Sequence, residues 1–128
     1  MNKYIVKIDP GEFPRVMSAP DELTLDYMQH TVARLIEVTP VWSDLACAVP
    51  GLIMIVNEEG KLFDLDANAY ATIVSKHPLD TKHGTAIMAV REGENIRPLT
   101  EGEAQKLAAL LSKWLQVEIE LEREEEYA

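Results

Sequence analysis

The chain has 128 residues, 47% of them hydrophobic, and a formal net charge of −10 from 22 acidic and 12 basic side chains. This length and composition are typical of one globular domain rather than of a disordered chain. The acidic excess argues against direct binding of DNA or RNA, because that binding depends on clustered lysine and arginine. No apolar run approaches the length of a membrane-spanning helix, and no signal peptide is recognisable. We therefore expect a soluble cytoplasmic protein without a membrane or nucleic-acid partner.

The single cysteine, Cys47, lies among small apolar residues. One cysteine cannot form a disulfide within the chain, which suits a reducing compartment. We expect Cys47 to be a buried structural side chain, because cysteine in such surroundings usually packs as a small hydrophobe.

The N-terminal part of the chain predicts two strands and a helix. Residues 4–8 are rich in β-formers and end at an Asp-Pro-Gly turn, and residues 14–18 can pair back on them as an edge strand. Apolar residues then recur at steps of three and four. This spacing predicts a helix that Asp21 or Thr24 caps and that ends near Ile36.

The segment after this helix is expected to be extended. Pro40 prevents residues 37–42 from continuing as a helix, and Ser43 with the following aspartate marks a turn. Trp42 is expected to anchor the core or its rim.

A β-hairpin is predicted in the middle of the chain. Residues 52–56 and 61–65 are strand-like and flank an Asn-Glu-Glu-Gly turn, in which Gly60 would supply a positive φ. A short helix over residues 67–74 follows, with Asp66 as its cap.

The C-terminal part predicts a central strand and a long helix. Residues 84–90 are apolar enough to lie in the middle of a sheet. Thr100 and Glu103 have the spacing of a capping box, which starts the helix. Its apolar stripe is broad: Leu107, Leu110, Leu111, Trp114, Leu115 and Val117.

These elements predict the α+β class, with a small mixed or antiparallel sheet and two or three helices. We expect a single domain over residues 1–117 and a frayed acidic tail over residues 118–128. Because the helix stripe is wider than one face needs, Trp114 and Leu115 are candidates for a homodimer interface.

The sequence contains no recognisable catalytic or metal-binding constellation. Residues 64–68 match the first five positions of a calcium-binding loop, Asp-x-Asp-x-Asn. However, Ala69 and Ser75 occupy the positions where that loop needs glycine and glutamate. Residues 77–83 hold two histidines and an aspartate, but a proline interrupts them and no further ligand is near. Phosphate-loop, serine-hydrolase and zinc-protease motifs are missing. We expect no enzyme, no catalytic residue, no metal and no cofactor.

The acidic C-terminus has two interpretations. It can keep the protein soluble, or it can bind the basic nucleic-acid groove of another protein through complementary charge. For the second case the candidate residues are Glu118, Glu120 and Glu122. The hairpin tip offers a further set of candidates for partner binding: Asn57, Glu58, Glu59 and Lys61.

One run of motifs resembles a known family. The motifs are Asn57-Glu-Glu-Gly-Lys-Leu, then Asn68, then Gly84-Thr85, then Leu99-Thr100-x-x-Glu103. Over most of residues 1–112 the chain resembles the phage and mobile-element proteins grouped as domain of unknown function 3846. It departs from their usual pattern in its acidic C-terminal extension and at Ala89-Val90. The resemblance implies no catalytic residues.

The resemblance implies a phage or prophage accessory protein that acts in the cytoplasm of a bacterial host cell. Our leading hypothesis is a non-enzymatic protein that binds and inhibits a bacterial defence protein. A second hypothesis is an oligomeric sponge for a nucleotide immune signal, for which the candidate ligand residues are Asn68, Lys82, Thr85 and Arg91. A structural or interaction module without a defence role is the third.

Overall fold

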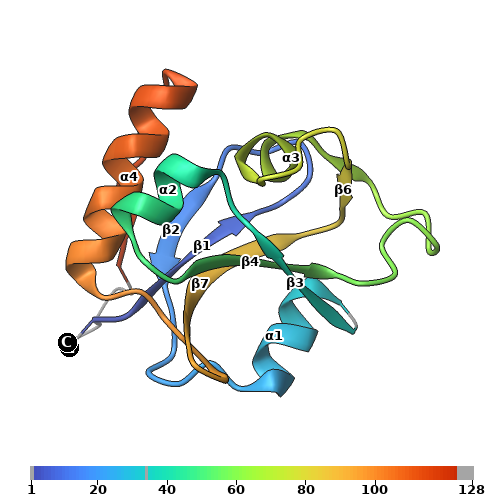
Figure 1. Ribbon diagram of the computed structural model, residues 1–128, viewed down its shortest axis with the longest axis horizontal. Coiled ribbons are helices and arrows are strands. Elements are labelled where there is room, and N and C mark those ends of the chain that lie inside the picture. Colours follow the sequence, from blue (N-terminus) through green and yellow to red (C-terminus); the bar gives the residue numbers. More distant parts are fainter. Residues whose placement is uncertain (1, 34, 124–128) are drawn as a thin grey trace.

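The computed structural model describes residues 2–33 and 35–123, and within them the chain folds as α+β, as predicted (Figure 1). The main sheet has the strand order β3-β4-β7-β1-β2-β9, with β8 paired to β7. Its strands are β1 (Tyr4–Ile8), β2 (Arg15–Ser18), β3 (Ile36–Pro40), β4 (Leu52–Asn57), β7 (Ala86–Glu92), β8 (Asn95–Arg97) and β9 (Leu121–Glu122). A second sheet pairs β5 (Ala67–Asn68) with β6 (Lys82–His83). The helices are α1 (Leu25–Val32), α2 (Ser43–Ala48), α3 (Ala69–Val74) and α4 (Glu101–Leu115).

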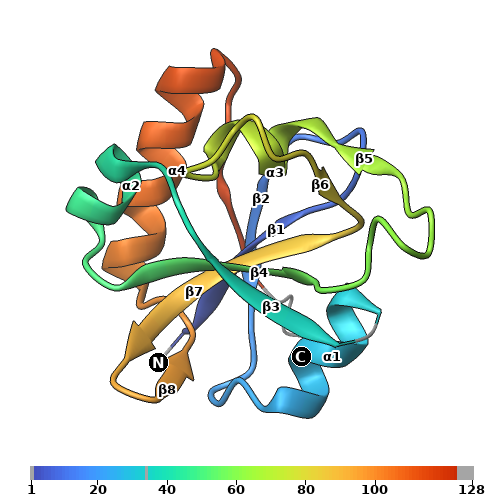
Figure 2. The ribbon, with the colours of Figure 1, turned by 45° about the vertical axis from the view of Figure 1, so that its right-hand side comes forward.

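Helices cover both faces of the main sheet, so two hydrophobic cores form. The larger core joins one face to α2, α3 and α4, and the smaller core joins the other face to α1 (Figures 1 and 2). The predicted central strand, β7, pairs with β4 on one side and with β1 and then β8 on the other, and its residues 86–90 are buried. This arrangement confirms that an almost wholly apolar strand lies in the middle of the sheet.

The first helix is shorter than predicted. Thr24 caps it, with its side chain accepting a hydrogen bond from the Tyr27 amide, and α1 ends at Val32, where Ala33 adopts a left-handed conformation (φ 81°). Ile36 therefore belongs to β3 and not to the helix.

The predicted hairpin over residues 52–65 is wrong. Its first strand exists as β4, but β4 already has β3 on one side and β7 on the other, so residues 61–65 have no free edge to join and form turns instead. Gly60 does not have a positive φ. It is needed for close packing, since a Cβ at this position would lie 2.7 Å from the His83 carbonyl oxygen.

Two further local predictions fail. The segment from Ser43 is not a turn but the start of α2, and Cys47 is exposed on that helix rather than buried. The cap of α3 is Asn68, whose side-chain oxygen accepts from the Ala71 amide, and not Asp66.

The second strand and the C-terminus differ from expectation together. Residues 15–18 pair with β1 as predicted, but they are not an edge, because β9 pairs with them in parallel on the other side. After α4, Gln116 turns the chain with a left-handed conformation (φ 55°), and residues 121–122 then pair with β2. Within the predicted acidic tail, residues 119 and 121 pack on the core and residues 121–122 pair with β2, whereas residues 124–128 lie outside the described residues.

Candidate protein-binding site

The most distinctive surface is the segment from Val117 to Glu122, called here the acidic strand, of which the last two residues form β9. Apolar and acidic residues alternate along it. Side chains of an extended chain point alternately to opposite sides. Accordingly Ile119 and Leu121 pack against the larger core, whereas all three glutamates, at positions 118, 120 and 122, are exposed. The acidic residues predicted to bind a partner thus lie on one side of an ordered segment.

Backbone and side-chain contacts hold the acidic strand against the domain. Its end pairs with β2, with Leu121 opposite Val16. Its start is tied to α4 by Ser112, whose hydroxyl accepts from the Ile119 amide (3.0 Å) and lies 2.6 Å from the Ala108 carbonyl oxygen. The glutamates are therefore presented at defined positions and not on a loose chain.

Arg15 on β2 binds one of the three glutamates. Its guanidinium donates two hydrogen bonds to the Glu122 carboxylate, at 2.9 Å from Nε and 2.6 Å from Nη2. These bonds raise the pKa of Arg15 and lower the pKa of Glu122. Glu118 and Glu120 have no ion-pair partner among the described residues. Their charges remain available to a partner.

Two hollows border the acidic strand. One, of about 440 Å³, lies between residues 11–15 and residues 117–122. Its lining carries the acids Glu12, Glu118, Glu120 and Glu122 against the single base Arg15, a net charge of −3 (4 acids less 1 base). Its rim also holds Phe13, 46% exposed, whose ring packs on Tyr70 with centroids 4.9 Å apart. This surface combines acidic charge with an exposed aromatic ring.

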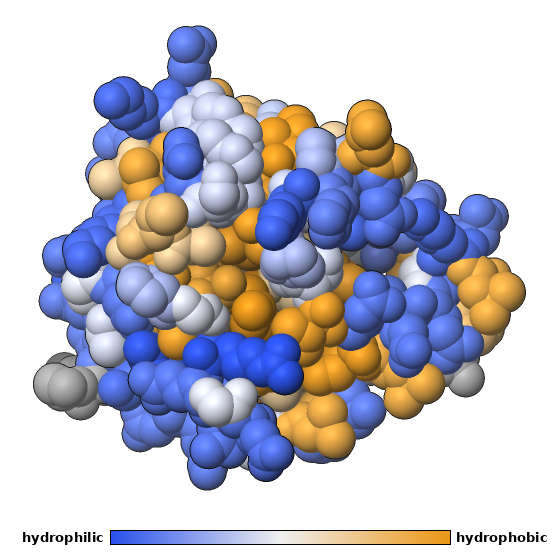
Figure 3. Space-filling view, viewed as in Figure 1, coloured by the Kyte–Doolittle hydropathy of each residue, from blue (hydrophilic) through white to orange (hydrophobic). Residues whose placement is uncertain are grey.

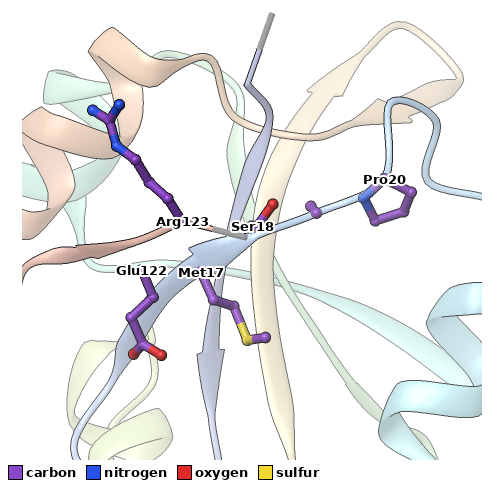
Figure 4. Close-up of a pocket in the computed structure, with 6 residues that line it drawn as sticks. Met17, Ser18, Pro20, Glu122 and Arg123 are labelled. Carbon is purple, nitrogen blue, oxygen red and sulfur yellow. The ribbon is translucent and has the colours of Figure 1, made fainter. Parts of the chain in front are cut away.

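The second hollow, of about 480 Å³, lies where β9 ends beside β2 (Figure 4). Met17 and Glu122, which are opposite each other in the register, point to the same side there, and Arg123 points away from them. Arg123 contacts Glu101 of α4 at 3.0 Å. The acidic face is thus bounded at its end by an arginine that is already paired.

The second predicted partner site, residues 57–61, is not a hairpin tip. Asn57 is buried and has a structural role: its Nδ2 donates to the Val32 carbonyl and its Oδ1 accepts from the Glu59 amide. Lys61 forms an ion pair with Asp80 at 2.6 Å. Of the four predicted residues, Glu58 and Lys61 are exposed and Glu59 is half-buried.

Asp80 links two lysines next to this loop. Its carboxylate contacts Lys61 Nζ at 2.6 Å and the largely buried Lys82 Nζ at 3.1 Å. The hydrogen bond from Lys61, followed by that from Lys82, lowers the pKa of Asp80 to about 2. The adjoining hollow holds about 150 Å³, less than the roughly 300 Å³ at which small-molecule sites usually begin.

The four candidate ligand residues of the sponge hypothesis do not form one site. Asn68 is fully buried and bonded to the carbonyls of Ile8 and Gly84. Thr85 donates to Asp9 at 2.6 Å, whereas Arg91 lies six positions further along the chain, about 20 Å away at the usual rise of a strand. Lys82 alone of the four lines the small hollow described above.

The candidate dimer residues have partners within the chain. Trp114 stacks on Trp42 of α2, with ring centroids 4.2 Å apart and planes at 22°, and Leu115 is half-buried. The stack confirms that Trp42 anchors the rim of the core. Homodimerisation stays a prediction.

The part of the chain that the structure describes brings no three histidine, cysteine, aspartate or glutamate side chains together in a metal-binding arrangement. In the same residues, none of the helices is long and apolar enough to span a bilayer.

Fold and site together define a small α+β protein that presents an acidic edge strand. The family model described as Domain of unknown function (DUF3846) matches residues 1–112, and the chain belongs to that family, as its motifs indicated. No curated protein and no solved structure matches the chain. The match ends within α4, so the acidic strand lies beyond it.

Sequence reasoning missed that residues 117–122 pack on the domain and end in a strand, β9. The signal was present, because strict alternation of apolar and acidic residues over 117–122 is typical of a half-buried strand. The alternation does not identify Arg15 as the partner of Glu122, since the two residues are 107 positions apart in the sequence.

Proposed function

We propose that this chain is a non-enzymatic binding protein that docks its acidic strand on a basic surface of a partner protein. The observation that carries the proposal is the ordered row of glutamates, two of which have no cationic partner among the described residues. Because the strand is already fixed by Ser112 and β2, binding costs little further ordering of its backbone.

Charge favours a particular class of partner. The hollow beside the acidic strand has a net charge of −3, and the whole chain has −10. Complementary potentials speed encounter and select partners with a positive surface. Proteins that bind nucleic acid have such surfaces, because they need lysine and arginine for the phosphates. The acidic strand would therefore compete with DNA or RNA for the same groove.

The more specific form of the proposal concerns biological context. We propose that the partner is a nucleic-acid-binding protein of a bacterial defence system and that the chain, acting in the host cytoplasm as a phage or prophage product, inhibits it. This step is supported by the resemblance of the chain's motifs to those of phage and mobile-element proteins.

The test is capture of partners from bacterial lysate on the immobilised full chain, followed by elution in increasing NaCl. We expect a captured protein that itself binds DNA, that duplex DNA displaces, and that elutes as the Debye length falls from about 10 Å at 0.1 M to about 3 Å at 1 M salt. Glu118→Gln/Glu120→Gln should weaken its binding about tenfold, from the loss of two exposed charge pairs.

A matched control separates position from net charge. Glu58→Gln/Glu59→Gln removes the same number of charges from the predicted loop site and should leave affinity unchanged. Equal loss in both variants would mean that only total charge matters. Binding that neither DNA nor the acidic-strand variant affects would refute the proposal.

A further inference from the structure

The outer edge of β3 has unpaired backbone groups. β3 is the last strand at its end of the main sheet, with β4 as its neighbour. The Glu58 amide donates to the Leu35 carbonyl at 2.9 Å, and the Pro40 carbonyl accepts from Lys76 on the opposite side at 3.0 Å. Because hydrogen-bonded and non-bonded positions alternate in an antiparallel pair, the N–H and C=O groups of Ile36 and Val38 point away from β4. No described residue bonds them.

The two edges of the main sheet differ in how their backbone groups are covered. At the other end β9 covers β2, so β2 is not exposed as an edge. Proteins commonly protect an open edge with lysine, proline or a bulge. On β3 the proline, Pro40, stands at the end of the strand, and the stretch before it is regular and carries the single charge of Glu37.

Apolar side chains flank this edge. Leu35 is 48% exposed, and Ile36 and Val38 are half-buried. Figure 2 shows β3 running in front of β4 and β7, and Figure 3 shows hydrophobic side chains gathered over the centre of the face where β3 and β4 lie in Figure 1. A strand added here would cover apolar surface as well as satisfy the backbone.

A hollow with spare negative charge opens beside the edge. Glu37 lines the 150 Å³ hollow together with Glu58, Asp80 and the two lysines that Asp80 binds. Three acids against two lysines leave a net charge of −1 (2 less 3) from these five side chains. Neither Glu37 nor Glu58 has an ion pair in the described part of the chain. The hollow therefore suits a cationic side chain.

We propose that the outer edge of β3 binds an extended segment of a partner protein as an added strand, with a lysine or arginine of that segment beside Glu37. In strand addition, main-chain hydrogen bonds provide affinity and pockets for alternate side chains provide specificity. Here Ile36 and Val38 supply the bonds, and the hollow beside Glu37 supplies the pocket.

A second copy of this chain fits the edge less well. The antiparallel register that uses all four outward groups pairs Ile36 with Val38 of the other copy, which places Glu37 opposite its own counterpart. Like charges directly opposite each other destabilise a strand pair. The register centred on Val38 avoids that contact but pairs Ile36 with Pro40, which has no N–H and whose carbonyl is already bonded.

The test uses the full chain and fluorescent synthetic peptides of about nine residues, the length of a long strand. The peptides alternate valine and threonine and carry lysine, glutamine or glutamate at the centre. We expect the lysine peptide to bind about fivefold more tightly than the glutamate peptide, from one cross-strand charge pair. Glu37→Lys should reverse this order, and the control Glu94→Lys, on an exposed turn, should not.

Hydrogen exchange locates the binding. At a lysine-peptide concentration of about ten times Kd, exchange of the Ile36 and Val38 amides should slow about tenfold. A peptide N-methylated at the positions facing β3 should not bind, and this control leaves the protein unchanged. Binding without protection of these two amides, or an unchanged peptide order in Glu37→Lys, overturns the proposal. So does concentration-dependent protection without peptide, which would assign the edge to a second copy.

This inference is independent of the acidic strand, which lies at the opposite end of the sheet. Glu118→Gln/Glu120→Gln should therefore leave peptide binding unchanged, so that failure of one proposal can be told from failure of the other.

Discussion

Ser112→Ala tests whether the acidic strand must be held in place to act. The Ser112 hydroxyl accepts a hydrogen bond from the Ile119 amide (3.0 Å) and donates one to the Ala108 carbonyl oxygen (2.6 Å). The substitution removes this link between α4 and the acidic strand but changes no charge. A tail that acts only through its net charge would not respond to it.

The expected magnitude follows from one neutral hydrogen bond. Such a bond contributes about 1 kcal/mol, and water can reach the partly exposed Ile119 amide once the serine is gone. A loss of about 1 kcal/mol makes local opening of the strand about fivefold more frequent. The core contacts of α4 remain, because Leu107 and Leu111 lie on its buried side.

Hydrogen exchange of the Ile119 amide is the direct measurement, and we expect it to quicken about fivefold in Ser112→Ala. Affinity for the captured basic partner should fall by up to the same factor. Ser43→Ala, a serine exposed on α2, is the matched control and should change neither quantity. Unchanged Ile119 exchange would refute the structural reasoning. Faster exchange with unchanged affinity would show that binding does not need the ordered strand.

Three stability predictions follow from other contacts. Asn68→Ala leaves the Ile8 and Gly84 carbonyls without their buried donor, so the free energy of unfolding measured in urea should fall by about 3 kcal/mol. Gly60→Ala should cost about 1–3 kcal/mol in the same assay, because its Cβ would meet a backbone oxygen 2.7 Å away. The hydrogen bond from Arg97 lowers the pKa of Glu103 from its usual 4.5 to about 2, so this carboxylate stabilises the fold above pH 4.5 and loses that effect as the pH falls towards 2. Glu103→Gln should lower the free energy of unfolding by about 1–2 kcal/mol at pH 7. It should also flatten the dependence of the urea midpoint on pH between pH 4.5 and 2, and an unchanged pH dependence would contradict the assignment.

Local sequence signals determined several elements of this protein. The Thr100–Glu103 capping box forms as predicted, with reciprocal hydrogen bonds, because both partners lie within one helical turn. The first strand and the central strand were also predictable, because β-rich composition and continuous apolar character report on burial directly. Family membership followed from motifs of the same local kind.

Tertiary structure decided the elements whose state depends on a distant neighbour. Residues 61–65 have strand-like composition but form turns, because β3 and β7 already occupy both edges of β4. Conversely, the acidic strand is ordered because β2, Ser112 and Arg15 meet it from far along the chain. A strand is stable only when another strand completes its hydrogen bonds, and the sequence of a segment does not contain the identity of that partner.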